Sequence, residues 1–271
     1  MQKSEAYVSK KPDEKGIIEY IADEDKIWAE LYLRQQKLIE KYACQEYIQG
    51  VKDLGLPTDR VPQLDEVSAS LGKHTGWSVS AVPALISFNR FFKLLAEKKF
   101  PAATFIRRRE HMDYLQEPDI FHEIYGHCPL LTNPVYADFM ETYGKIGVNA
   151  SDKDQVLLAR LYWFTVEFGL MKSKQSGVCC YGAGLLSSNG ETVYSVESDI
   201  PERKPFTILD ALRTPYRYDI FQTTYFVIEG FQQLYDLINQ DLLGQIKLAR
   251  ELGEFKPTFP PKEEASVWKN C

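Results

Sequence analysis

The chain has 271 residues, of which 44% are hydrophobic and 26% charged, so it can bury a substantial core and does not have the composition of a disordered chain. Its net charge of −6 argues against nucleic acid as a partner, because nonspecific affinity for nucleic acid comes from many Lys and Arg side chains on phosphates. No uncharged run is longer than residues 74–89, which is shorter than the roughly 18 apolar residues of a membrane-spanning helix, so we expect no membrane segment.

The cysteines are odd in number and form no C-x-x-C pair, and the polar N-terminal segment has no apolar signal core. A disulfide-stapled secreted protein is therefore disfavoured, because such proteins pair their cysteines in an oxidising compartment. We expect a reduced, cytoplasmic protein.

The first half of the chain is dominated by apolar residues at helical spacing. These patterns predict helices over 23–53, 62–72, 84–99 and 117–127, and a strand over 102–108. Gly55 is expected to end the first of these helices, and Pro118 lies in the first turn of the last one.

The second half combines helix signals with one hairpin signal. Further helices are predicted after Pro134, over 156–171 and over 230–251. Ser151, with Asp154 three residues later, resembles a capping box ahead of the apolar run. Asn189-Gly190 is the two-residue signal of a type I′ turn and predicts two short strands that meet there.

No repeat, linker-like change in composition or low-complexity block divides the chain. One mainly α-helical domain with a few short strands is therefore the simplest partition. We expect a polar, flexible leader over 1–20, the folded domain over 21–255 and a tail rich in proline and charge over 256–271.

The segment EPDIFHEIYGHCP carries two of the four histidines, His122 and His127. Imidazole is a favoured ligand for Zn, Cu, Ni and Fe at neutral pH. Zinc hydrolases place two histidines four residues apart on one helical face, but these are five apart, about 140° around an ideal helix. A helix that loosens or ends at Gly126 could turn His127 back toward His122. The alternative is structural, with His122 in a core and His127 capping a helix end.

Glu167 is the candidate third ligand, because it lies in the apolar segment LYWFTVEFGLM, where an unpaired carboxylate is costly. The alternative is a solvated stripe, since charged residues recur every seven positions from Lys153 to Lys174. The pattern alone leaves both interpretations open. If Glu167 converges with the two histidines, the three groups form the facial triad typical of non-haem Fe(II) oxygenases.

At these residues the sequence resembles the pterin-dependent aromatic amino acid hydroxylases, most closely the bacterial members that act on phenylalanine. The matching segments are YLQEPDIFHEIYGHCPLL (114–131), LARLYWFTVEFGL (158–170) and YGAGLLSSNGE (181–191). The resemblance implies the catalytic-domain fold of that family, a helical basket around a non-haem iron, with the catalytic domain over 21–255. It also implies that His122, His127 and Glu167 hold Fe(II), and that phenylalanine is converted to tyrosine with O2 and tetrahydrobiopterin or a related reduced pterin.

The same resemblance assigns the substrate residues. Arg107 matches the arginine that grips the substrate carboxylate, and Trp163, Phe168, Gly184 and Ser187 match positions that line the amino acid pocket. A guanidinium can bond both oxygens of a carboxylate, and an aromatic wall suits a ring substrate. On the sequence alone, Arg107 belongs to an Arg-Arg-Arg-Glu run typical of a solvated basic patch, and aromatics at helical spacing are more often core.

The pterin residues are implied in the same way. Phe91 matches the aromatic that stacks on the pterin, and Glu123 matches a catalytic carboxylate near both the pterin and the iron. The wall around the pterin corresponds to Ala84, Leu85, Ile86, Ala159 and Tyr162. Without the resemblance, Phe91 would be interpreted as a core residue.

Some features depart from the animal members of the family. Leu115 stands where they usually carry a threonine, and 1–20 and 256–271 are too short for their regulatory domain and tetramerising coiled coil. We therefore expect no allosteric activation by phenylalanine, and a monomer or small homo-oligomer whose partners are small molecules: L-phenylalanine, O2 and the reduced pterin. Hydroxylation of tryptophan or tyrosine, and a non-enzymatic acidic interaction module, are the competing hypotheses.

Overall fold

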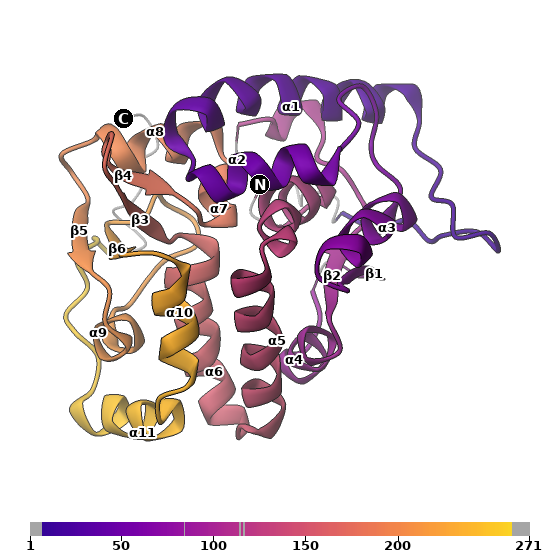
Figure 1. The fold of residues 1–271 in the computed structure, drawn as a ribbon. Helices are drawn as coiled ribbons and strands as arrows, with labels where there is room; N and C mark the ends of the chain where they lie inside the picture. Colours follow the sequence, from indigo (N-terminus) through magenta and orange to yellow (C-terminus); the bar gives the residue numbers. More distant parts are fainter. Residues whose placement is uncertain (1–6, 84, 114, 116, 262–271) are drawn as a thin grey trace.

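The computed structural model describes residues 7–83, 85–113, 115 and 117–261, and helices make up most of it (Figure 1). The α-helices are α1 (Ala22–Tyr42), α2 (Gln45–Leu54), α3 (Leu64–His74), α4 (Phe88–Ala96), α5 (Pro134–Asn149), α6 (Asp152–Tyr162), α7 (Ala183–Leu186), α8 (Asn189–Glu197), α9 (Ile208–Arg213), α10 (Phe231–Ile238) and α11 (Leu242–Leu252). The tighter 3₁₀ turns are η1 (Arg109–His111) and η3 (Cys128–Thr132), and the wider π-helical turns are η2 (Phe121–His127) and η4 (Trp163–Glu167). The predicted class, mainly α with a few short strands, is confirmed.

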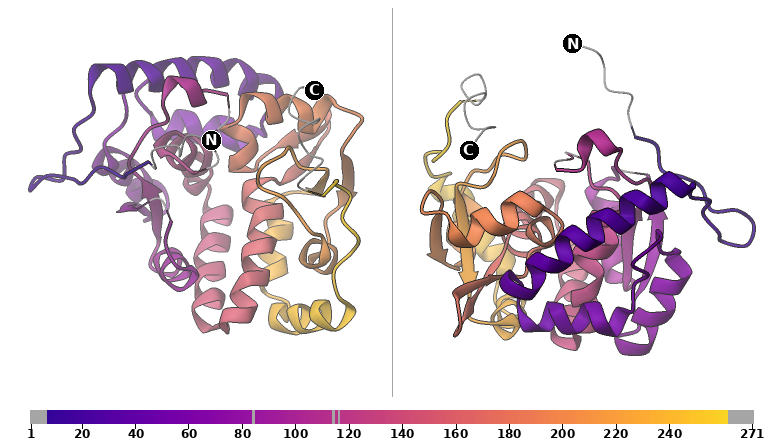
Figure 2. Two further views of the ribbon diagram at one scale, coloured as in Figure 1. Left: turned by 180° about the vertical axis from the view of Figure 1, so that it is seen from behind. Right: turned by 90° about the horizontal axis from the view of Figure 1, so that it is seen from above.

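Two small sheets flank the helices. The strands are β1 (Ser78–Val82), β2 (Lys99–Ala103), β3 (Leu170–Ser173), β4 (Gly177–Cys180), β5 (Glu202–Pro205) and β6 (Thr224–Ile228). β1 and β2 pair in parallel, from Ser78 opposite Lys99 to Val82 opposite Ala103. The other sheet has the order β4-β3-β6-β5, in which only the β3–β4 pair is antiparallel. Figure 1 places this second sheet and the β1–β2 pair on opposite sides of the upright helices α5, α6 and α10, and α1 lies across the top of them, as the view from behind in Figure 2 also shows.

The single helix predicted over 23–53 is wrong, because the chain breaks into α1 and α2. Ala43 adopts an extended conformation at the break and forms a β-bridge with Cys180, and the Cys44 amide donates to the Cys180 carbonyl at 2.9 Å. A long-range backbone pairing therefore interrupts the local helix at these two residues. The predicted end at Gly55 is confirmed, with Gly55 in the left-handed conformation at φ 63°.

The hairpin predicted at Asn189-Gly190 is also wrong, because these two residues begin helix α8. The Ser188 hydroxyl caps that helix by accepting from the Glu191 amide at 3.3 Å. Glu191 and Thr192 are buried in the next turn, where Thr192 accepts a hydrogen bond from Gln35 of α1. These tertiary contacts outweigh the local turn preference. The hairpin of this region lies earlier, between β3 and β4, and Gly177 at φ 77° follows its turn.

The remaining predicted elements are present with changed boundaries. Ser151 caps α6 as predicted, but the apolar run 156–171 continues into η4 and strand β3 instead of one helix. The strand predicted over 102–108 ends at Ala103, so Arg107 lies in an extended loop. The helix predicted over 230–251 is two helices, because Asp241 caps α11 through the Gly244 amide.

Helix α4 packs closely along α5 because two glycines of α5 leave room for it. A Cβ at Gly144 would lie 2.3 Å from the Ala96 amide nitrogen, and one at Gly147 would lie 2.2 Å from the ring of Phe92. This close approach fixes α4, and with it Phe91, against α5. Among the described residues, no helix combines the length and the apolar character needed to cross a membrane.

Candidate active site

His122 and His127 both lie on η2, and the π-helical geometry resolves their five-residue spacing. In a π-helix the backbone bonds join residues five apart, so such residues follow one another along one face. The helix loosens as predicted, but over its whole length instead of at Gly126. Gly126 instead allows α7 to pack closely against η2, because a Cβ there would lie 2.9 Å from the Ala183 carbonyl oxygen and would push α7 away.

Three side chains bring their donor atoms to one point in this site. The Nε2 atoms of His122 and His127 lie 3.1 Å apart. Glu167, at the end of the second π-helical turn η4, places one carboxylate oxygen 3.5 Å from His122 Nε2 and the other 3.3 Å from His127 Nε2. The solvated stripe considered for Glu167 is therefore wrong, since its side chain is only 17% exposed and faces the histidines.

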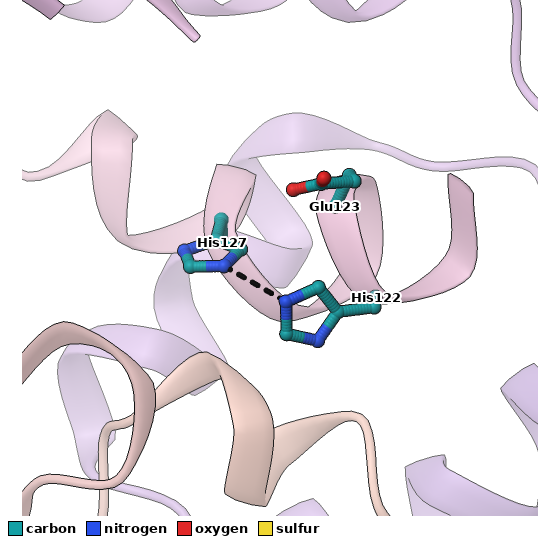
Figure 3. A group of neighbouring side chains, drawn as sticks. All are labelled: His122, Glu123 and His127. Atoms are coloured by element: carbon teal, nitrogen blue, oxygen red, sulfur yellow. Dashed lines mark hydrogen bonds between the residues drawn. The ribbon is translucent and has the colours of Figure 1, made fainter. Parts of the chain in front are cut away.

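These distances fit a single metal ion. Nitrogen and oxygen ligands lie about 2.0–2.2 Å from a first-row metal, so two ligands about 90–110° apart are separated by about 3.0–3.4 Å. Glu123 is a second carboxylate near the ion position, because its oxygen and the histidine nitrogens lie within 4.8 Å of one another (Figure 3). Glu167 lies within 3.5 Å of both Nε2 atoms, which keeps it the candidate third ligand beside Glu123.

Ser187 orients the first of the two imidazoles. Its hydroxyl donates to the Ala183 carbonyl at 2.8 Å and lies 2.9 Å from His122 Nδ1. Because the hydroxyl proton is already used, Nδ1 carries the proton that bonds Ser187. The lone pair of His122 is then on Nε2, which faces Glu167 and His127. A partner of this kind is characteristic of metal-binding histidines.

The protonation states suit a metal site. Burial lowers the pKa of His122 to about 4, so its ring is neutral at pH 7. Burial by itself raises the pKa of Glu167, but the two imidazoles outweigh burial and lower the pKa below its ordinary value. Burial also raises the pKa of Glu123 well above the ordinary value for a carboxyl group. The structure thus places two carboxyl groups whose pKa values are shifted in opposite directions beside the neutral imidazole of His122.

The metal-ligand cluster opens into a cavity of about 430 Å³. Every predicted site residue within the described part of the chain lines it: Leu85, Ile86, Phe91, Arg107, His122, Glu123, His127, Ala159, Tyr162, Trp163, Glu167, Phe168, Gly184 and Ser187. Ala84, the other predicted residue, lies outside the described residues. Residues spread over more than 100 positions therefore meet around one space, of the size that holds small ligands.

Arg107 is buried rather than solvated, so the basic-patch interpretation is wrong for this residue. Only 6% of it is exposed. Its Nε donates to Asp119 Oδ2 and its Nη2 to Asp119 Oδ1, both at 2.8 Å. Asp119 also accepts from the backbone amides of Arg107 and His122. One fully buried carboxylate therefore ties the arginine to the first turn of η2.

Aromatic rings form one wall of the cavity. The Trp163 ring lies 4.5 Å from the Phe168 ring and stacks on the Tyr216 ring at 4.6 Å between centroids. Gly184 leaves room for this wall, because a Cβ there would lie 2.7 Å from Phe168 Cζ. Phe91 also lines this cavity, and its ring and the Tyr162 ring are nearly perpendicular, with centroids 5.2 Å apart.

Residues 2–246 match the sequence family described as biopterin-dependent aromatic amino acid hydroxylase. The chain belongs to this family. The hydroxylase is 53% identical to the phenylalanine-4-hydroxylase of Pseudomonas aeruginosa over 263 residues, which cover 97% of this chain and 100% of the relative.

Two solved structures are similar over most of the hydroxylase. One is the apo structure of the cold-active phenylalanine hydroxylase from Colwellia psychrerythraea 34H, with a TM-score of 0.91, 54% identity and coverage of 95% of this chain and 99% of that one. The other is the Chromobacterium violaceum phenylalanine hydroxylase with bound oxidized Fe(III), with a TM-score of 0.85, 42% identity and coverage of 90% and 89%. A metal and a biopterin are therefore cofactors of this fold.

The sequence pointed to no role for several polar residues that the hydroxylase places at the cavity. The Gln222 side-chain oxygen accepts from Trp163 Nε1 at 3.0 Å, and the Gln222 backbone amide donates to a carboxylate oxygen of Glu191 at 2.8 Å. Glu191 is buried, also accepts from Tyr225, and burial raises its pKa to about 7. Glu191 ends the matched segment YGAGLLSSNGE, which was its one signal in the sequence. Asp119 likewise lies in the matched segment 114–131, whereas Gln222 carried no signal, because its partners Trp163 and Glu191 are distant in the chain.

Proposed function

We propose that the hydroxylase is a phenylalanine 4-monooxygenase that converts L-phenylalanine to L-tyrosine with O2, Fe(II) and tetrahydrobiopterin or a related reduced pterin. The observation that carries this proposal is the meeting of the His122, His127 and Glu167 donor atoms within 3.1–3.5 Å, at the cavity of about 430 Å³. When bound, the iron and the reduced pterin supply O2 activation and two electrons.

We assign the metal to His122, His127 and Glu167, with Ser187 fixing the tautomer of His122. Two imidazoles and one carboxylate leave the opposite coordination positions open, as an oxygenase requires. The second carboxyl group, on Glu123, lies beside this set without being part of it. In its protonated form it can donate a hydrogen bond to the pterin or to an oxygen atom near the metal.

Arg107 is the residue proposed to hold the substrate carboxylate. A guanidinium has five N–H groups in a fixed fork, and Asp119 accepts from Nε and one side of Nη2. The end-on edge, formed by Nη1 and the other Nη2 hydrogen, has the geometry for a second carboxylate. The ring of the amino acid is then placed against Trp163, Phe168 and Gly184.

The pterin is proposed to lie on the side of the cavity lined by Phe91 and Tyr162. Leu85 and Ile86 come from the loop that follows β1, and Ala159 comes from α6. Leu85 is 79% exposed, so it stands at the mouth, where a bound pterin would cover apolar surface.

Turnover decides between this function and its alternatives. Purified protein loaded with Fe(II) is supplied with reduced pterin and O2, and kcat/KM is measured for phenylalanine, tryptophan and tyrosine. We expect tyrosine from phenylalanine at the highest kcat/KM, and loss of turnover in Glu167→Ala. A preference for tryptophan or tyrosine would establish the second reaction on the same scaffold. Failure to bind iron would favour the interaction module.

The division into a leader over 1–20, a catalytic domain over 21–255 and a tail over 256–271 remains a prediction. We also propose a monomer or small homo-oligomer in the cytoplasm. Four cysteines within the described residues, Cys44, Cys128, Cys179 and Cys180, are buried free thiols, which fits a reducing compartment. Light scattering of the purified protein measures the oligomeric state.

A further inference from the structure

The segment before α1 crosses the ends of the parallel strands β1 and β2. In this segment the Ser9 hydroxyl donates to the Val82 carbonyl at 3.0 Å and accepts from the Thr104 amide at 3.2 Å. Val82 and Ala103 are the last paired residues of the two strands. One hydroxyl therefore joins the two main chains at the point where their own ladder ends. We call residues 7–10 the strap; in Figure 1 it belongs to the indigo part of the ribbon that precedes α1.

Thr104 is held by this N-terminal segment through each of its polar groups. Its amide donates to Ser9, its hydroxyl donates to the Lys10 carbonyl at 2.6 Å, and its carbonyl accepts from the Tyr20 hydroxyl at 2.8 Å. Thr104 is fully buried, and a buried polar group without a partner is costly. The strap and Tyr20 thus fix the backbone three residues before Arg107.

The strap also holds the chain on either side of Arg107. The Tyr7 ring stacks on the Phe105 ring, with centroids 4.7 Å apart and an interplanar angle of 18°. The Tyr7 hydroxyl accepts from the Arg108 amide at 3.1 Å. Contacts at 104, 105 and 108 therefore bracket the arginine, although no strap residue itself lines the cavity.

The two strands that Ser9 joins lead to different walls of the cavity. β1 runs into the loop that carries Leu85 and Ile86, and β2 runs into the loop that carries Arg107. We propose that Ser9 and Thr104 are positioning residues, through which the strap sets the pterin loop and the carboxylate-binding arginine relative to each other. The proposal rests on the function proposed above, because it concerns the binding of phenylalanine and pterin in that cavity.

Kinetics of point variants test this proposal. Ser9→Ala removes the hydroxyl that joins Val82 and Thr104. Thr104→Val removes the hydrogen bond to the Lys10 carbonyl with little change in side-chain shape. We expect Ser9→Ala to raise KM for both phenylalanine and the reduced pterin by about 3- to 10-fold, the effect of one net hydrogen bond. Thr104→Val should raise KM mainly for phenylalanine. In both variants kcat should change less than about 2-fold and Fe(II) affinity should be unchanged, since the metal ligands are untouched.

Conservative variants separate positioning from general stability. Ser9→Thr and Thr104→Ser keep the hydroxyl groups, so they should restore KM to near the wild-type value. The matched control is Ser176→Ala, which removes an exposed hydroxyl bonded to the Val178 carbonyl in the β3–β4 turn. A lower melting temperature with unchanged KM in Ser9→Ala, or a KM that rises equally in Ser9→Thr, would overturn the proposal.

Amide hydrogen exchange of the protein without ligands provides a readout that does not depend on turnover. Peptides covering 82–86 and 104–107 should exchange faster in Ser9→Ala than in wild type, while peptides of η2 keep their rates. Unchanged exchange in both peptides would contradict the proposal that the strap holds these two loops. If the wild-type protein forms no tyrosine, the proposed function fails, but the exchange experiment still decides whether the strap holds these two loops.

Discussion

Replacing Asp119 with asparagine tests the buried ion pair that holds Arg107, the residue proposed to bind the substrate carboxylate. Asp119 is fully buried and accepts four hydrogen bonds: three from Arg107, at 2.8–2.9 Å, and one from the His122 amide, at 3.0 Å. The asparagine side chain has the same shape, but its NH2 group faces donors and the guanidinium loses its counter-charge. Two bonds at least are lost, and the Arg107 charge stays buried.

The magnitude follows from the burial of both partners. Removing one partner of a buried pair costs about 3–5 kcal/mol, because the other charge is left uncompensated. At about 2–4 °C per kcal/mol for a chain of this size, the melting temperature should fall by about 6–20 °C. KM for phenylalanine should also rise, since Arg107 is no longer held in place.

Calorimetry and urea unfolding measure this change. The control is Asp23→Asn, which removes an aspartate from an exposed pair with Arg109 and should change the midpoint little. A melting temperature for Asp119→Asn within about 2 °C of wild type would refute the assigned strength of the buried pair.

The same pair predicts a dependence on pH. Burial alone raises the pKa of Asp119, but Arg107 outweighs burial and lowers it below the ordinary value. A carboxyl group of this kind stabilises the fold fully above its unfolded pKa, about 3.9, and loses that contribution as the pH falls through the lower folded pKa. The unfolding free energies of wild type and Asp119→Asn should therefore converge below about pH 4.

Three further variants test other parts of the site. Ser187→Ala should weaken Fe(II) binding by about 10- to 100-fold in a metal titration, because His122 loses the partner that fixes its tautomer; unchanged affinity would contradict this. Gly184→Ala should raise KM for phenylalanine, because the new Cβ displaces Phe168, and steady-state kinetics checks it. Glu191→Gln should remove a pH dependence of the unfolding free energy. Burial raises the pKa of Glu191 to about 7, so wild type should lose stability as the pH rises from about 4.5 to 7, whereas the variant should not. Urea unfolding across this range measures the difference.

The sequence predicted most helices because their apolar faces repeat locally, but it could not predict where distant contacts interrupt them. The break at Ala43 depends on the Cys180 backbone, 137 positions away. Asn189-Gly190 has a strong local turn preference, yet it begins a helix whose next residues are buried against α1. In both places tertiary contacts outweigh local preference.

The site residues, too, were predictable only in part from the sequence. Histidine scarcity and the resemblance located His122, His127 and Glu167, and the structure brings their side chains together. Spacing alone gave His127 the wrong face, because it assumes an α-helix, whereas η2 is a π-helix over its full length. Asp119 lies in the matched segment 114–131, but its role could not be predicted, since it comes from being buried against Arg107.

The most direct test of the central claim is a crystal structure of the protein with Fe(II) and a reduced pterin, with the iron located by anomalous diffraction at its absorption edge. We expect one iron about 2.0–2.2 Å from His122 Nε2, His127 Nε2 and a carboxylate oxygen of Glu167, with the pterin against Phe91. Iron bound by Glu123 in place of Glu167, or located outside the cavity, would contradict the account.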